Sequence, residues 1–304
     1  MRPQALALLL LLTTPAHAAD LPPWPQPDLE TLPPGIWADT VRAGADLITR
    51  TYAFIGPEVK NPAMRYAGNN LACGSCHLAA GTQRFGLPLE GVYGVFPTFI
   101  ARENEVRTLE DRINGCMERS MNGRALPFDG PEMKAMVSYI AFISDGQIVG
   151  QSLIGRATPP LPKLSRPANP AHGAEVYVQN CAPCHGAQGQ GVHHTEPGDA
   201  NGYQFPPLWG PDSYNDGAGM HRLIAAAQFI HANMPLGTNF ETPALSVPDA
   251  WDVAAYINSK PRPHRENLDQ DYPNRALKPV DAPFPPYADA LPAEQHKLGP
   301  FPGK

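Results

Sequence analysis

Apolar positions recur at helical spacing in four stretches of the chain, which form two similar pairs. Each half has an early segment of helical character, Val41–Phe54 or Ala171–Asn180, and a later amphipathic segment with a tyrosine, Met133–Ile140 or Ala250–Ile257. Apolar residues three and four positions apart share one face of a helix. The pattern therefore predicts a mainly α-helical protein with two similar halves.

Proline marks the connections around these halves. Residues 157–170 are rich in proline, which predicts a semi-rigid linker between a first domain at 19–156 and a second at 171–260. Residues 261–304 hold ten prolines and show no convincing helical pattern. We expect this last segment to be an irregular tail that wraps over the domains.

The N-terminus has the features of a secretory signal peptide at residues 1–18. Arg2 supplies a positive start, Ala5–Leu12 form a short apolar run, and Ala16-His17-Ala18 fits a cleavage site. The run is shorter than the ~20 residues that cross a bilayer, so we expect no membrane insertion. The signal pattern predicts cleavage after Ala18 and a periplasmic location. The formal charge of −6 makes nucleic acid a poor partner.

Four of the five cysteines lie in two Cys-x-x-Cys-His motifs. Each motif contributes two thiols and one imidazole: Cys73, Cys76 and His77, then Cys181, Cys184 and His185. Thiols at this spacing attach haem as thioethers, and the adjacent histidine binds the iron. The histidine after each pair and the export signal disfavour a zinc knuckle or a redox dithiol. The sequence therefore predicts two covalently bound haems c in two tandem class I-like cytochrome c domains.

The second iron ligand has a main candidate in the second half. Met234 lies 49 residues after His185, and methionine is an established ligand of c-type haem. Met220, His221 and His231 are the alternatives in that half. We expect His185 and Met234 to bind the second iron.

The first half offers a cysteine and two methionines for the same role. Cys116 lies 39 residues after His77, and Met117 and Met121 follow it, so spacing alone does not choose among the three. A free cysteine is often a buried packing residue, and two methionine-ligated haems would make a plain electron carrier. From spacing alone, that non-enzymatic carrier is as good an interpretation as an enzyme.

The neighbours of Cys116 favour the enzyme. On a predicted helix at Thr108–Asn122, Arg112 lies four residues before Cys116 and Ser120 four after, so the three share one face. Arg102 lies just upstream. Arginine beside a thiol favours the thiolate and binds an oxyanion through two hydrogen bonds. Residues 102–124 include as many acidic as basic side chains. The alternative interpretation is therefore that these arginines only form ion pairs.

These stretches resemble the dihaem thiosulfate dehydrogenase and tetrathionate reductase family, which is related to the haem–cysteine subunits of sulfur-oxidising systems. The most specific match is Glu110–Gly123, and Asn70–His77, Leu87–Tyr93 and Asn233–Gly237 also match. The resemblance covers residues 36–257 and does not explain the proline-rich tail.

The resemblance implies an activity and roles for the first domain. Cys116 would bind the first iron opposite His77 and act as the reactive sulfur, while Arg102, Arg112 and Ser120 would line the substrate pocket. The enzyme would interconvert two thiosulfates and tetrathionate through a cysteine S-thiosulfonate. Two electrons would pass to or from a c-type cytochrome or similar partner.

The resemblance also implies that Met234 binds the second iron. Some relatives carry a lysine just before this methionine and switch ligands between oxidation states. Asn233 occupies that position here, which argues against such a switch. A dihaem peroxidase is the remaining enzymatic alternative, and only His193 and His194 suggest it.

Overall fold

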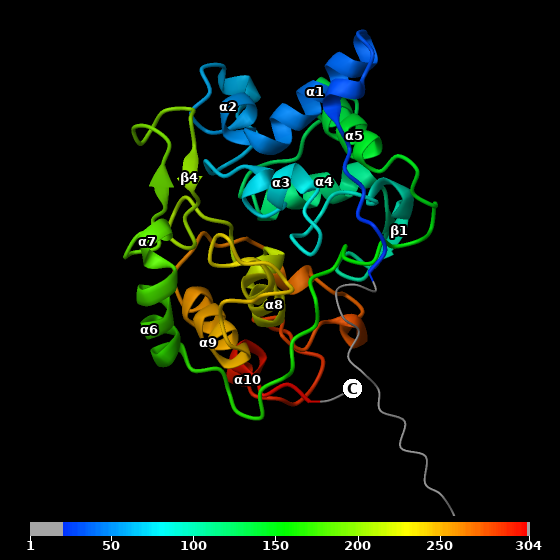
Figure 1. The fold of residues 1–304 in the computed structure, drawn as a ribbon. Coiled ribbons are helices and arrows are strands. Elements are labelled where there is room, and N and C mark those ends of the chain that lie inside the picture. The colour runs from blue at the N-terminus through cyan, green and yellow to red at the C-terminus, as the bar shows by residue number, and fades with distance from the viewer. Residues whose placement is uncertain (1–20, 303–304) are drawn as a thin grey trace, which may run out of the picture.

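The computed structural model describes residues 21–302, which fold mainly into helices (Figure 1). The expected signal peptide at 1–18 lies outside these residues. The helices in the described part are α1 (Ile36–Thr49), α2 (Thr51–Ile55), α3 (Leu78–Gly81), α4 (Leu109–Arg119), α5 (Pro131–Ile143), α6 (Pro170–Asn180), α7 (Ala182–His185), α8 (Leu223–Asn233), α9 (Val247–Asn258) and α10 (Ala293–Leu298). Two antiparallel strand pairs accompany them: β1 (Thr98–Ile100) with β2 (Glu105–Arg107), and β3 (Val192–His193) with β4 (Tyr203–Phe205).

One helix crossing forms the centre of each half. α1 packs against α5 in the first half, and α6 packs against α9 in the second. A Cβ atom on Gly44 would lie 2.0 Å from the carbonyl oxygen of Ala135, and one on Gly173 would lie 2.0 Å from that of Asp252. Because only glycine allows backbones to approach this closely, the same device shapes both crossings.

Each half has its own hydrophobic core. The first core contains buried residues between Leu32 and Ile143, and the second contains buried residues between Ala168 and Phe301. Residues 157–169 form neither helix nor strand, and α6 begins at Pro170. The mainly helical fold with two similar halves is thus confirmed.

The structure differs from the sequence expectation at the first helix. The segment Val41–Phe54 belongs to two helices, α1 and α2, which meet at Arg50. Arg50 has φ −134° and ψ 41°, outside the helical region, so the chain breaks there. α1 also begins five residues earlier than predicted, at Ile36 after Gly35. Within the described part of the chain, no helix is long and apolar enough to cross a membrane.

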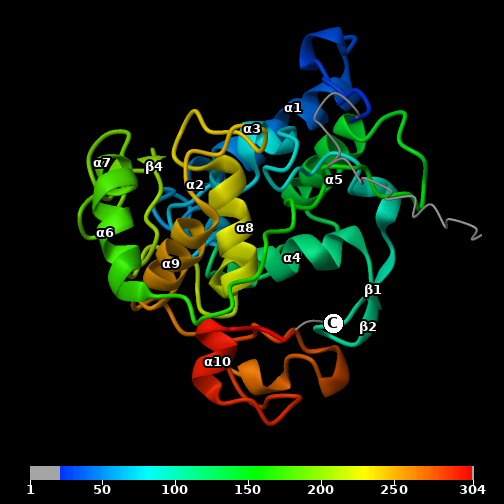
Figure 2. The same ribbon diagram turned by 60° about the horizontal axis from the view of Figure 1, so that its bottom comes forward.

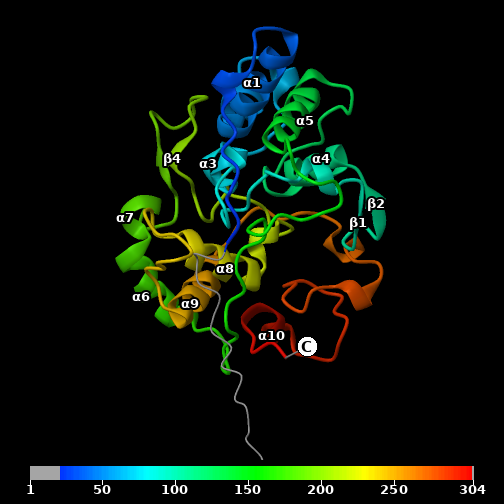
Figure 3. The same ribbon diagram turned by 45° about the vertical axis from the view of Figure 1, so that its right-hand side comes forward.

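The tail contacts both halves and is more regular than its proline content indicates. It includes α10, and Phe301 packs in the second core with its ring centroid 6.1 Å from that of Trp251. Figures 2 and 3 show the preceding tail segment, in orange, near β1 and β2 of the first half. The tail therefore joins the two halves along one side of the molecule.

Candidate active site and haem cavities

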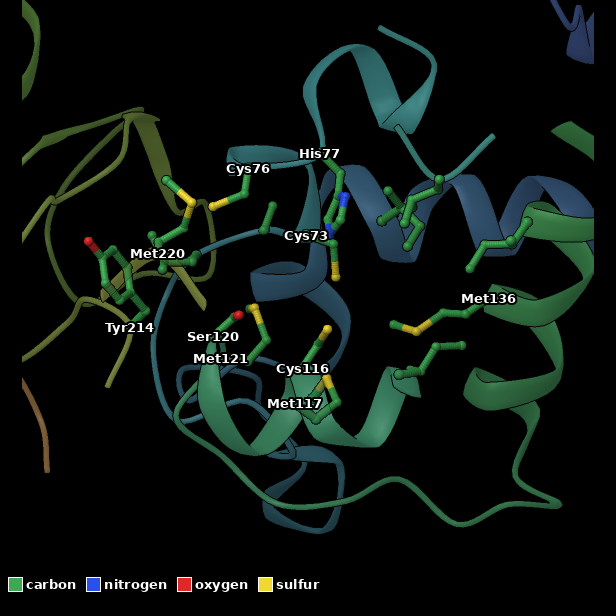
Figure 4. Close-up of a pocket in the computed structure, with 16 residues that line it drawn as sticks. Cys73, Cys76, His77, Cys116, Met117, Ser120, Met121, Met136, Tyr214 and Met220 are labelled. Carbon is green, nitrogen blue, oxygen red and sulfur yellow. The ribbon is translucent and has the colours of Figure 1, made fainter. Parts of the chain in front are cut away.

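A cavity in the first half gathers the first motif and one face of α4 (Figure 4). His77 lies at one side of this cavity, and Cys116 and Ser120 lie at the other. The cavity has a volume of about 700 Å³, solvent at its mouth included, and the remaining wall is mostly apolar: Ile48, Leu71, Leu89, Ile113, Met136 and Ile140. An apolar cavity with two cysteine thiols and an imidazole in its wall fits a covalently attached haem.

Both motif histidines are oriented by a backbone carbonyl. Nδ1 of His77 lies 2.5 Å from the oxygen of Leu87, and Nδ1 of His185 lies 2.8 Å from the oxygen of Pro206. An imidazole whose Nδ1–H donates to a carbonyl keeps Nε2 free for a metal. Burial also lowers the pKa of both rings, which favours the neutral form. Each histidine is thus prepared to bind iron through Nε2.

The first pair of motif thiols is buried. Burial raises the pKa of Cys73 to about 11 and that of Cys76 to about 12. Reactive redox dithiols have lowered pKa values, so these thiols do not suit thiol–disulfide exchange. They suit permanent attachment of haem, as the motif predicts.

A second cavity contains the other motif. Cys181, Cys184 and His185 line it together with Met234, which directly follows α8. Met220 also lines this cavity. The other two candidates, His221 and His231, do not belong to its lining among the described residues. The geometry is consistent with Met234 as the second ligand, which stays a prediction.

The two cavities adjoin each other. Five residues line both of them: Leu71, Ala72, Cys76, Tyr214 and Met220. Tyr214 and Met220 come from the second half and lie beside Cys76 of the first in Figure 4. Groups bound in the two cavities would be neighbours, which suits electron exchange between them.

α4 carries Cys116 and begins with a reciprocal cap. The hydroxyl of Thr108 accepts the backbone N–H of Asp111, and the Asp111 carboxylate accepts the backbone N–H of Thr108. This capping box fixes where the helix starts and therefore which residues face the cavity. Helical spacing then places Arg112 one turn before Cys116, and Nη1 of Arg112 donates to its Sγ at 3.2 Å.

Three sulfur-bearing residues of this region line the first cavity. Met117 and Met121 are 1% and 2% exposed and belong to the first hydrophobic core. Cys116 is only partly buried, and Figure 4 shows its sulfur pointing into the cavity below His77. Cys116 is thus placed opposite the motif histidine and remains accessible; its binding to iron stays a prediction.

A polar pocket lies next to Arg112, and we call it the arginine pocket. Five arginines line it: Arg102, Arg107, Arg112, Arg119 and Arg265. Three of them form close ion pairs: Arg107 with Glu105 and Asp111, Arg119 with Asp271, and Arg265 with Glu118. The carboxylates therefore neutralise part of the pocket.

The remaining two arginines are the ones that the sequence singled out. In the described residues, Arg112 has no carboxylate partner within ion-pair distance, and Arg102 has only a long contact of 3.9 Å with Asp271. The alternative that all these arginines only form ion pairs is wrong for Arg112. Two cations of the arginine pocket are thus free to bind an anion, and one of them, Arg112, contacts Cys116.

The fourth predicted residue lies elsewhere. Ser120 lines the first haem cavity rather than the arginine pocket. Its backbone oxygen accepts a hydrogen bond from Nδ2 of Asn69 at 2.9 Å. Helical spacing places Ser120 one turn after Cys116, and both side chains line this cavity.

The tail supplies pocket residues that sequence reasoning missed. Arg265, Tyr272, Leu277 and Pro279 line the arginine pocket. Asp271 pairs with Arg119, which is 152 positions away in the chain. A contact over this separation leaves no periodic or motif signal in a single sequence.

Each half of the chain matches a known domain family. Residues 64–149 match the SoxA/TsdA cytochrome c domain, and residues 170–261 match the cytochrome c domain. The fold, the two cavities and these matches together define a c-type cytochrome with two covalently bound haems.

Similar proteins of known class specify which kind of dihaem cytochrome this chain is. Thiosulfate dehydrogenase of Allochromatium vinosum is 40% identical over 268 residues, which cover 86% of this chain and 93% of that protein. That of Stutzerimonas stutzeri is 38% identical over 242 residues, covering 80% and 74%. The solved thiosulfate dehydrogenase TsdBA from Marichromatium purpuratum superposes with a TM-score of 0.71 at 36% identity over 80% of this chain and 50% of its own. The chain belongs to the thiosulfate dehydrogenase family.

Proposed function

We propose that this protein interconverts two thiosulfate ions and tetrathionate and exchanges two electrons with a c-type cytochrome or similar partner. One observation carries the proposal: a single helix, α4, presents Cys116 to the first haem cavity and Arg112 to the thiol at 3.2 Å. Membership of the thiosulfate dehydrogenase family supports it. Two bound haems supply two one-electron acceptors, which matches the two electrons of the reaction.

In the first step Cys116, as thiolate, forms a bond to the sulfane sulfur of one thiosulfate. The product is a cysteine S-thiosulfonate, and two electrons are released. Arg112 lies at the sulfur, and Arg102 lies in the wall of the adjoining arginine pocket. Their positive charges offset the repulsion between the thiolate and the dianion.

In the second step the sulfane sulfur of another thiosulfate attacks the sulfane sulfur held by Cys116. The bond from Cys116 to that sulfur breaks, tetrathionate leaves and the thiolate is restored without further electron transfer. Direct union of two dianions would face their full mutual repulsion, and the covalent intermediate divides this into two steps. The same steps in reverse reduce tetrathionate.

The residues that would hold the two irons form part of the proposal. His77 and Cys116 would hold the first iron, and His185 and Met234 would hold the second. The carbonyl contacts of both histidines support their orientation toward the cavities. Electron paramagnetic resonance tests this, because a low-spin thiolate-ligated haem has a narrower spread of g-values than a His/Met haem.

Export to the periplasm is also proposed, with removal of the signal peptide after Ala18. The pattern of residues 1–18 supports this location. Mass spectrometry of the mature haem-loaded protein tests it: the expected N-terminal residue is Ala19, and a retained Arg2 would contradict cleavage.

The central test is thiosulfate-dependent reduction of the haem-loaded protein. Cys116→Ala should keep both haems and lose turnover by at least about 10³-fold, because the group that forms the covalent intermediate is removed. Met117→Leu is the matched control, since it replaces the adjacent sulfur in the core with a side chain of similar size. Full turnover in Cys116→Ala would refute the mechanism, and no turnover in the wild type would favour a plain electron carrier.

A further inference from the structure

We propose that Asp271 and Tyr272 of the tail are positioning residues of the substrate pocket, which hold Arg102 in place to bind the anion. The inference rests on the proposed function, because it assigns a role in binding the same substrate. It extends the site to a segment that lies more than 150 residues beyond Cys116 in the chain.

Asp271 makes a two-point contact with Arg119. Nη1 of Arg119 donates to Oδ2 of Asp271 at 2.9 Å, and Nη2 donates to Oδ1 at 2.7 Å. The two side chains are 7% and 9% exposed. A buried bidentate pair fixes the relative orientation of both partners. The tail is therefore anchored directly to the helix that carries Cys116.

Three contacts from the same dipeptide hold Arg102. The backbone N–H of Tyr272 donates to the carbonyl oxygen of Arg102 at 2.7 Å. The guanidinium carbon of Arg102 lies 5.9 Å from the centroid of the Tyr272 ring, and its Nε lies 3.9 Å from Oδ2 of Asp271. Burial lowers the pKa of Arg102, but Tyr272, Asp271 and Glu103 together outweigh this effect and raise it. Arg102 thus stays charged although it is largely enclosed.

The side chain of Arg102 is held but not satisfied. Its Nε is buried and has no hydrogen-bond partner among the described residues. A buried guanidinium N–H group without a hydrogen-bond acceptor is energetically costly, and an oxyanion in the pocket would supply acceptors. The dipeptide therefore presents a cation that is prepared for an anionic ligand.

The backbone of Tyr272 supports a functional role. Its φ of +58° lies in the left-handed region, which is unfavourable for a bulky residue. Arg275 stabilises the turn, because its Nη1 donates to the carbonyl oxygen of Asp271 at 2.6 Å. In this conformation Asp271 and Tyr272 reach two different arginines of the pocket.

The test separates binding from turnover. In haem-loaded protein, Asp271→Asn should raise the KM for thiosulfate about 5- to 10-fold and change kcat by less than about twofold. The haem resonance spectrum should stay that of the wild type. Asp269→Asn is the matched control, since it makes the same change two residues away at an exposed side chain and should behave as the wild type.

A second variant addresses the charge that Asp271→Asn would leave buried on Arg119. The double variant Arg119→Gln/Asp271→Asn removes both partners and should keep the raised KM, because Arg102 is still released. Calorimetric binding of thiosulfate to Cys116→Ala, with and without Asp271→Asn, should show the same weakening without turnover. Unchanged or tighter binding would overturn the inference, since Asp271 would then only screen the pocket.

The two proposals can fail separately. If the wild type does not oxidise thiosulfate but Asp271→Asn still weakens its binding, the proposed function is wrong and the positioning role stands. If turnover depends on Cys116 and both KM and binding ignore Asp271, the function stands and this inference is wrong.

Discussion

The two haem cavities are alike on the side of the motif histidine and differ on the opposite side. His77 and His185 each contact a loop carbonyl, of Leu87 and Pro206 respectively. On the other side, the first cavity has Cys116 within a helix beside arginines, and the second has Met234 after a helix. The comparison teaches that one scaffold fixes haem in both halves, while the opposite wall offers a thiol beside a cation in the first half and a thioether in the second.

A second difference lies in the loop after each motif. The run Leu87–Gly91 aligns with Pro206–Gly210, and each ends in a glycine at positive φ, 73° and 87°. Glu90 in the first loop thus corresponds to Trp209 in the second. Trp209 packs on aromatic rings, with its centroid 5.0 Å from that of Tyr177. Glu90 is 0% exposed, and its carboxylate oxygens have no hydrogen-bond partner among the described residues.

The largest expected effect comes from making the first cavity resemble the second. Cys116→Met should keep both haems but reduce thiosulfate turnover by on the order of 10³-fold, because a thioether cannot form the cysteine S-thiosulfonate. A methionine ligand also raises the haem potential relative to a thiolate. Steady-state assays, redox titration and electron paramagnetic resonance measure these changes.

A substitution in the second cavity provides the control for that experiment. Met234→Leu should alter the spectrum of the second haem and leave the thiolate signal of the first unchanged. If Cys116→Met left the resonance spectrum as in the wild type, Cys116 would not be an iron ligand, whatever happened to turnover.

Local patterns account for what could be predicted of these cavities. The motifs lie within five consecutive residues, and the contact of Arg112 with Cys116 follows from helical spacing. α10 spans only six residues, too few for an apolar period to show, and was not predicted. The contacts of Asp271 and the burial of Glu90 depend on how distant segments pack, and a single sequence holds no local signal for them.

The next effect concerns pH and the buried carboxyl that has no counterpart in the second half. Burial raises the pKa of Glu90 from 4.5 to about 7. The folded protein therefore binds this proton more tightly than the unfolded chain, so stability should fall as pH rises from near 4.5 to 7 and then level off. Glu90→Gln should remove this pH-dependent loss, which amounts to up to about 3 kcal/mol in the free energy of unfolding.

Denaturant unfolding of the haem-loaded protein between about pH 5 and pH 8 measures this dependence. Glu58→Gln, a change at an exposed carboxylate, is the control and should follow the wild type. If the wild type and Glu90→Gln differed by a constant amount at every pH, Glu90 would not titrate in this range.

The smallest expected effect comes from a substitution in the arginine pocket, a feature of the first half that we do not find beside Met234 among the described residues. Arg112→Gln should lower kcat/KM for thiosulfate about 10- to 30-fold, because it removes a cation that contacts the thiol at 3.2 Å. Stability should change by less than about 0.5 kcal/mol, since no carboxylate partner within the described residues is left without its cation. Arg107→Gln removes a cation of the same pocket that is already paired with Glu105 and Asp111, and it should reduce kcat/KM much less. Equal losses in the two variants would mean that the pocket attracts anions only through its total charge, and that Arg112 has no particular role at the thiol.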